Sequence, residues 1–135
     1  MRLALLLIPF TLLFAQTRPP ALENDYVRVL MGIDRPAAKP GPLHEHKQNR
    51  VMIYLDSGDL QIRHESGKVE DQHWKKGDIA WSAADGMHTS QNISSSPLRI
   101  IEIELRNAGN ANTPGVKGAV LDNAQVSVYR GTSAP

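Results

Sequence analysis

The sequence predicts an all-β protein, built as a single antiparallel barrel or sandwich. Strand-length stretches rich in β-branched and aliphatic residues recur along the chain, several of them at roughly 8–12-residue spacing, and Gly, Pro, Asn, Asp or Ser clusters separate them. After the first 15 residues, no stretch keeps a sustained helical period. A chain of 135 residues with 41% apolar and 21% charged residues has room for one domain with one core.

The first element is an apolar leader at residues 1–15. A positive start is followed by a largely apolar run of twelve residues that ends at Phe14, and the small Ala15 precedes a polar glutamine. This is the pattern of a signal peptide, whereas a membrane-spanning helix needs about 20 apolar residues. We therefore expect export to the periplasm or the medium with cleavage near Ala15, and no membrane association afterwards. An uncleaved anchor is the alternative.

The strands of the barrel are expected in order after a short linker. Residues 16–21 are polar and contain two prolines, which fits that linker, and the barrel is expected over residues 22–106. Turn sequences such as DSGD, ESGK, KKGD and SAADG mark the connections. The predicted strands are Tyr26 to Ile33, Arg50 to Asp56, Leu60 to His64, Lys68 to Trp74, Ile79 to Ser82, Met87 to Asn92 and Leu98 to Arg106.

Two of these strands predict which face lies inside. Residues of a strand alternate between its faces, and one alternate set in each strand is wholly aliphatic. We expect Glu102 and Glu104 to form a solvated outer face, with paired acid–base carboxylates as the alternative. Trp74 and Trp81 are expected to pack rather than to stack on a ligand. The residues expected to point inward are Val51, Ile53, Leu55, Ile101, Ile103 and Leu105.

Composition excludes several classes of function. The formal charge is +1 and no long run of like charges occurs, so neither nucleic acid nor an anionic membrane is an expected partner. The chain has no cysteine, which excludes disulfides, thiolate metal sites and a thiol nucleophile. Any chemistry must therefore use histidines, carboxylates or hydroxyls.

Three histidines are the candidate site. His44 and His46 are two residues apart, so on an extended strand both project to one face while Glu45 points to the other. His88 follows 42 residues after His46, close enough to a turn for an adjacent strand to bring it to the same place. Three neutral imidazoles suit Fe, Zn, Ni, Cu or Mn and leave coordination positions open. For the His-x-His pair alone, an ordinary surface pair is the alternative.

The spacing around these histidines forms two motifs. After His46 come four residues, Val51, six residues and Gly58; in the second segment Gly77 is followed by ten residues, His88, three residues and Asn92. Both segments resemble the motifs of the cupin superfamily, and the resemblance covers about residues 22 to 106. In that family a Glu ligand is expected where Val51 stands, so the resemblance does not identify a fourth ligand in this chain.

The resemblance implies a jelly-roll barrel of about six to eight strands, with a divalent metal in its mouth held by His44, His46 and His88. Some cupins use three histidines alone, notably those that resemble thiol or diketone dioxygenases, whereas others have lost the metal and only bind ligands. The expected partner is a small molecule. A metal-dependent dioxygenase or isomerase, a non-catalytic metal- or ligand-binding module and a structural barrel with vestigial histidines remain open. His64 and His73 are expected on the solvent face or the rim.

Residues 107–135 are expected to form a C-terminal extension with one strand. The segment from Val120 to Val128 repeats the pattern from Ala21 to Val29, ninety-nine residues further on. A strand needs a partner edge, so we expect it to cover the barrel or to pair across a homodimer. A chance likeness is the alternative.

Overall fold

The computed structural model describes residues 19–107 and 117–131, and these residues form strands and no helix. Accordingly, the described part of the chain holds no helix long and apolar enough to cross a membrane. The predicted leader at residues 1–15 lies outside the described residues, as do residues 16–18 of the linker and 108–116 of the C-terminal extension.

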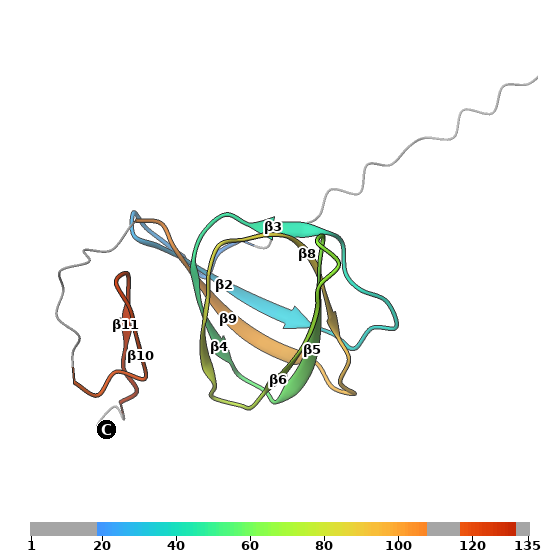
Figure 1. Ribbon diagram of the computed structural model, residues 1–135. Coiled ribbons are helices and arrows are strands. Elements are labelled where there is room, and N and C mark those ends of the chain that lie inside the picture. Colours follow the sequence, from blue (N-terminus) through green and yellow to red (C-terminus); the bar gives the residue numbers. More distant parts are fainter. Residues whose placement is uncertain (1–18, 108–116, 132–135) are drawn as a thin grey trace, which may run out of the picture.

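The strands fall where the sequence predicts them (Figure 1). All seven predicted strands are present, each with both ends within two residues of the prediction, and the His-x-His segment forms a further short strand. The strands are β1 (Leu22–Glu23), β2 (Val27–Asp34), β3 (His44–His46), β4 (Arg50–Tyr54), β5 (Gly58–His64), β6 (Val69–Trp74), β7 (Ile79–Ser82), β8 (Asp85–Asn92), β9 (Leu98–Leu105), β10 (Leu121–Asp122) and β11 (Ser127–Val128).

Two sheets wrap around a common interior. One has the strand order β1-β2-β9-β4-β7 and the other the order β3-β8-β5-β6. From β2 to β9 the chain crosses repeatedly from one sheet to the other, and all pairings between these strands are antiparallel. Figure 1 shows β3 and β8 together at one end of the resulting barrel. The predicted fold class, a single antiparallel jelly-roll barrel, is confirmed.

The interior of the barrel is lined by the even-numbered side chains of β4 and β9, whereas the odd-numbered side chains were predicted to point inward. The core cluster contains the even-numbered residues of β4 and β9, so the expectation that the odd-numbered set points inward is wrong. Val51 is only 1% exposed, but it does not line the interior. Alternation defines two faces of a strand, and here both faces are largely apolar, so composition alone does not select the inner one. The cluster consists of Met52, Tyr54, Leu60, Leu98 and Ile100.

Two motif glycines have clear structural reasons. A Cβ on Gly58 would lie 2.8 Å from Ser94 Oγ, which itself accepts a hydrogen bond from the Asp59 amide at 2.6 Å. Gly77 has a φ of 88°, in the left-handed region that favours glycine, and its N–H donates to the Tyr54 carbonyl at 2.7 Å. Both glycines therefore shape the connections that carry the chain between strands.

The C-terminal repeat folds into a hairpin rather than the single strand that was expected. Leu121 pairs with Val128 in the register in which Leu22 pairs with Val29. In both hairpins an asparagine side chain, that of Asn24 or Asn123, accepts hydrogen bonds from the amides two and three residues further on. The repeated pattern therefore encodes the same local turn twice.

The second hairpin lies beside the barrel, with β10 against β7. Asn49 donates to Gln125 Oε1 at 2.8 Å, and Gln125 Nε2 donates to the Asn107 carbonyl at 2.9 Å. Asn49 precedes β4, and its own side-chain oxygen accepts from the Ala84 amide at 2.7 Å. The hairpin is thus linked to the segments that precede β4 and β8.

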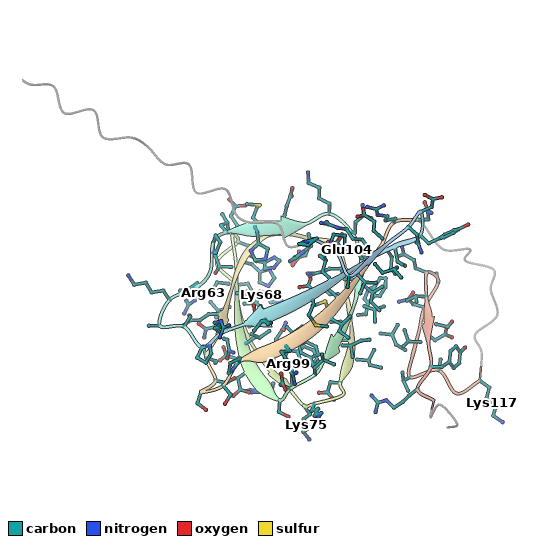
Figure 2. All side chains as sticks on the ribbon, turned by 180° about the vertical axis from the view of Figure 1, so that it is seen from behind. Arg63, Lys68, Lys75, Arg99, Glu104 and Lys117 are labelled. Atoms are coloured by element: carbon teal, nitrogen blue, oxygen red, sulfur yellow. The ribbon has the colours of Figure 1, made fainter. Side chains whose placement is uncertain are left out.

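The outer surface carries scattered basic side chains. Figure 2 shows Arg63, Lys75 and Lys117 pointing away from different parts of the molecule, and all three are exposed. Arg99, on β9, is exposed too and pairs with Asp56 through a Nε to Oδ2 contact of 2.7 Å.

Candidate metal site

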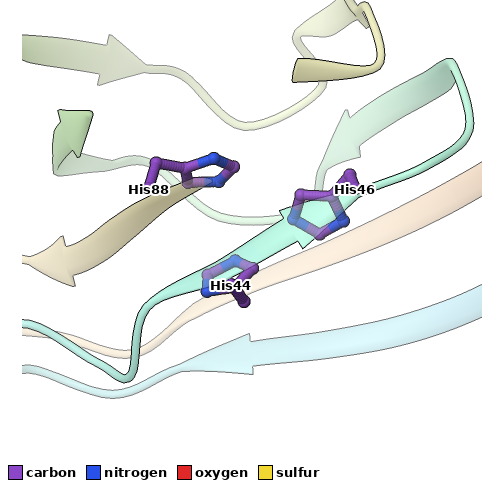
Figure 3. Close-up of side chains that lie close together, drawn as sticks. All are labelled: His44, His46 and His88. Atoms are coloured by element: carbon purple, nitrogen blue, oxygen red, sulfur yellow. The ribbon is translucent and has the colours of Figure 1, made fainter. Parts of the chain in front are cut away.

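The structure brings His44, His46 and His88 together at one end of the barrel (Figure 3). His44 on β3 is the direct cross-strand partner of His88 on β8, and a register shift follows between His44 and His46. The ring centroids lie 4.7 Å apart for His44 and His88, 4.9 Å for His44 and His46, and 5.3 Å for His46 and His88. One ring nitrogen of each lies within 4.8 Å of the others, and all three rings face a common space.

Backbone contacts select the tautomer of two of these rings. His44 Nδ1 lies 2.9 Å from the Pro42 carbonyl oxygen, and His88 Nδ1 lies 3.0 Å from that of Gly86. A carbonyl oxygen only accepts, so each Nδ1 carries a hydrogen, and in the neutral ring the lone pair is then on Nε2. Contacts of this kind orient metal-binding histidines and fix their tautomer.

His46 is held in its neutral form by its surroundings. Burial lowers the pKa of His46 to about 3, and the charges of Arg50, His44 and His88 act in the same direction. A neutral imidazole is the form that binds a metal.

The three-histidine donor set fits a divalent ion. Two nitrogens bound to one ion at about 2.1 Å lie at most about 4.2 Å apart. The observed separations, within 4.8 Å, therefore need only small side-chain adjustments to reach a shared ion. The donor set has no carboxylate, which favours Zn, Ni, Cu or Fe over Mn or Mg.

The histidines open onto a cavity of about 870 Å³. Small-molecule sites are commonly of about 300–1,000 Å³ and mostly apolar. One wall is a stacked pair, Tyr54 and Trp74, with centroids 3.9 Å apart and planes at 11°. Trp74 packs as predicted, and it also lines the cavity. Leu60 and Ile100 add aliphatic surface.

An ion pair that the sequence did not predict lies in the same cavity. Arg50 is 6% exposed, and it donates to Glu102 Oε2 at 2.9 Å and to Ser82 Oγ at 2.8 Å. The expectation that Glu102 and Glu104 form a solvated outer face is therefore wrong: their side chains are only 20% and 17% exposed, and Glu104 pairs with Arg28. A Cβ on Gly32 would lie 3.3 Å from Glu102 Oε1, so the glycine leaves room for this carboxylate.

The structure also shows that the residue at the expected family Glu position points away from the cavity. Val51 stands there in the sequence, but its side chain does not line the cavity, whereas that of Arg50 does. Val51 is buried on the other face of β4, opposite Ile103 and Trp81 in the register. The side chain that β4 presents to the cavity next to the histidines is thus a cation.

Two further ionisable residues line the cavity. Burial raises the pKa of Asp34, and so does the charge of Glu102, while that of His44 opposes them. His64 lies with its ring centroid 6.0 Å from that of His88, between Asp85 at 3.3 Å and Glu70 at 3.5 Å.

The remaining predictions for single side chains agree with the structure in part. His73 is exposed and pairs with Asp59, as a solvent-face residue should. Glu45 points outward and pairs with Lys47. Sequence reasoning did not identify Arg50 as a cavity residue. A usable signal was present, because Arg50 and Glu102 place opposite charges in two strands that are otherwise largely apolar.

Comparisons with known proteins support the fold. A scan against protein-family models finds no match, and a search of curated proteins finds no relative. A cupin domain from Bordetella pertussis Tohama I superposes with a TM-score of 0.59 at 19% identity, over 65% of this chain and 90% of that one.

Two further solved structures agree with this result. A protein with a double-stranded β-helix domain from Klebsiella pneumoniae has a TM-score of 0.51 at 21% identity, over 67% and 71% of the two chains. An RmlC-like cupin from Methanocaldococcus jannaschii has a TM-score of 0.51 at 15% identity, over 68% and 85%. The fold is therefore a double-stranded β-helix. This is the fold of the solved cupin domains, and it agrees with the fold that the resemblance of the two motifs implied.

Proposed function

We propose that His44, His46 and His88 bind a divalent metal ion and that the protein is a metal-dependent enzyme acting on a small molecule, as an oxygenase or an isomerase. The observation that carries this proposal is the convergence of three imidazole nitrogens, within 4.8 Å of one another, on a cavity of about 870 Å³. When bound, a divalent ion supplies open coordination positions that polarise substrate oxygens.

The chain's own residues prepare the site. The Pro42 and Gly86 carbonyls orient the rings of His44 and His88 before any ion binds. Neutral His46 needs no deprotonation at ordinary pH. The stacked Tyr54 and Trp74 give the cavity one aromatic wall.

The test is metal content after extensive dialysis. The wild type, His46→Ala and His73→Ala are reloaded with Fe(II) under anaerobic conditions and separately with Zn(II), then analysed for elements. The wild type and His73→Ala, which removes an exposed histidine outside the site, should retain close to one ion per chain, and His46→Ala should retain little. Equal and substoichiometric content in all three proteins would contradict the proposal. A loaded protein that binds small ligands but never turns one over would instead be a non-catalytic binding module.

We also propose that the protein is exported to the periplasm or the medium. The support is the leader at residues 1–15, whose apolar run is too short to span a membrane and ends before a small residue. N-terminal sequencing of protein from the extracytoplasmic fraction should find a start near Gln16. Full-length protein in the cytoplasm would contradict this.

A further inference from the structure

Arg50 is a buried cation at the edge of the histidine cluster. It lies on β4, four residues after His46, with 6% of its surface exposed. Its side chain lines the same cavity as the three histidines. The cavity therefore places a guanidinium beside three imidazoles that would carry no charge as metal ligands.

The guanidinium has hydrogen-bonding capacity to spare. Of its five N–H groups, one is directed at Glu102 and one at Ser82, and Nε has no partner among the described residues. A buried donor without a partner is destabilising, so such donors mark places where an acceptor is missing.

Other residues of the cavity also carry nitrogens that lack a good hydrogen-bond acceptor. In the described part of the chain, the buried nitrogens Arg50 Nε and Trp74 Nε1 lack a hydrogen-bond partner, and His64 Nε2 has only Glu70 Oε2, at 3.5 Å. All three residues line this one cavity. A ligand rich in acceptor oxygens would supply what the protein does not.

The balance of charge points the same way. Glu102 offsets the charge of Arg50, and two further carboxylates of the cavity, Glu70 and Asp85, lie beside His64 rather than beside the three clustered histidines. Three neutral imidazoles leave the two positive charges of a bound ion uncompensated. An anion that contacts both the ion and Arg50 would compensate this charge.

We infer that the cavity recognises a small organic carboxylate, which lies between the three-histidine centre and Arg50. Arg50 binds the carboxylate through its unused N–H groups, and Glu102 acts as an internal anion that holds Arg50 in place and competes with the ligand. The metal half of this arrangement rests on the function proposed above, whereas the Arg50 half does not.

The test compares anions with neutral molecules of the same shape. Zn(II)-loaded protein is titrated calorimetrically at pH 7.5 with three pairs: acetate and acetamide, lactate and lactamide, malonate and malonamide. The wild type should bind at least one carboxylate ten or more times more tightly than its amide. Arg50→Met should remove this preference, and Glu102→Gln should strengthen carboxylate binding several-fold. Arg99→Met, which removes an exposed arginine that also pairs with a carboxylate, should change nothing.

Each outcome decides between the two halves. No preference for any carboxylate in the wild type, or an unchanged preference in Arg50→Met, would overturn the inference. Circular dichroism shows whether Arg50→Met is folded; if it is not, the rise in affinity of Glu102→Gln decides, and its absence refutes the role of the ion pair. A wild type that retains no Zn(II) but prefers carboxylates would refute the metal site alone. Zn(II) retained without a carboxylate preference would refute only this inference.

Discussion

The buried ion pair between Arg50 and Glu102 makes the sharpest prediction about stability. The change is Arg50→Met, which removes the cation and keeps much of the volume. The side chain of Arg50 is 7% exposed and that of Glu102 is 20% exposed, so the variant leaves a carboxylate with little access to water. Breaking such a pair from one side costs about 3–5 kcal/mol.

The magnitude follows from what replaces the lost contact. Glu102 keeps some contact with solvent, which places the cost near the lower limit, at about 3 kcal/mol. For a domain of this size that lowers the Tm by roughly 10–15 °C. In the double variant Arg50→Met/Glu102→Gln no charge is left unpaired, so the cost should be well below the sum of the single changes.

The assay is urea unfolding of the metal-free protein at pH 7.5, arranged as a double-mutant cycle. The matched control is the exposed pair of Arg99 and Asp56, whose coupling should be much the smaller because solvent screens it. If Arg50→Met cost less than about 1 kcal/mol, or if the two cycles gave equal coupling, the interior placement of Arg50 would be refuted.

Three further predictions follow from the same structure. Val51→Glu should destabilise the protein without tightening Zn(II) binding, because Val51 is fully buried on the face of β4 away from the cavity; a tighter Zn(II) titration would contradict this. Since burial lowers the pKa of His46 to about 3, and the group in an unfolded chain titrates near 6.5, the unfolded chain takes up the proton first. The metal-free protein should therefore lose stability as pH falls from about 6.5 towards 3, and a urea series should show a weaker loss in His46→Asn. Deleting residues 122–135 removes the contacts of Gln125 with Asn49 and of Arg130 with Gly77. The Tm should therefore fall or the oligomeric state should change. If both stay the same, the hairpin contributes neither to stability nor to assembly.

The sequence predicted the strands because the signals for strands and turns are local. β-Branched residues, alternation and the Gly- and Asp-rich connections act within a few residues, and all seven expected strands are present. His44 and His46 share a face through strand alternation alone, and the spacing to His88 carried the resemblance to a cupin. The repeat around Asn24 and Asn123 is equally local, since each asparagine caps its own turn.

The choice of inner face, by contrast, depended on contacts between strands distant in sequence. Val51 and Ile53 are as apolar as Met52 and Tyr54, so the pattern of β4 alone fits either orientation. A buried arginine is tolerated only where an acceptor meets it, and that acceptor, Glu102, comes from β9, 52 residues further on.

The chain by itself thus determined its strands, its turns and the three histidines of the candidate site. Tertiary structure decided which side of each strand is interior, and it placed Arg50, Glu102, Asp34 and His64 around the cavity. The physical reason is that the cost of burying a charge depends on its partner, and the partner is known only once the strands have paired.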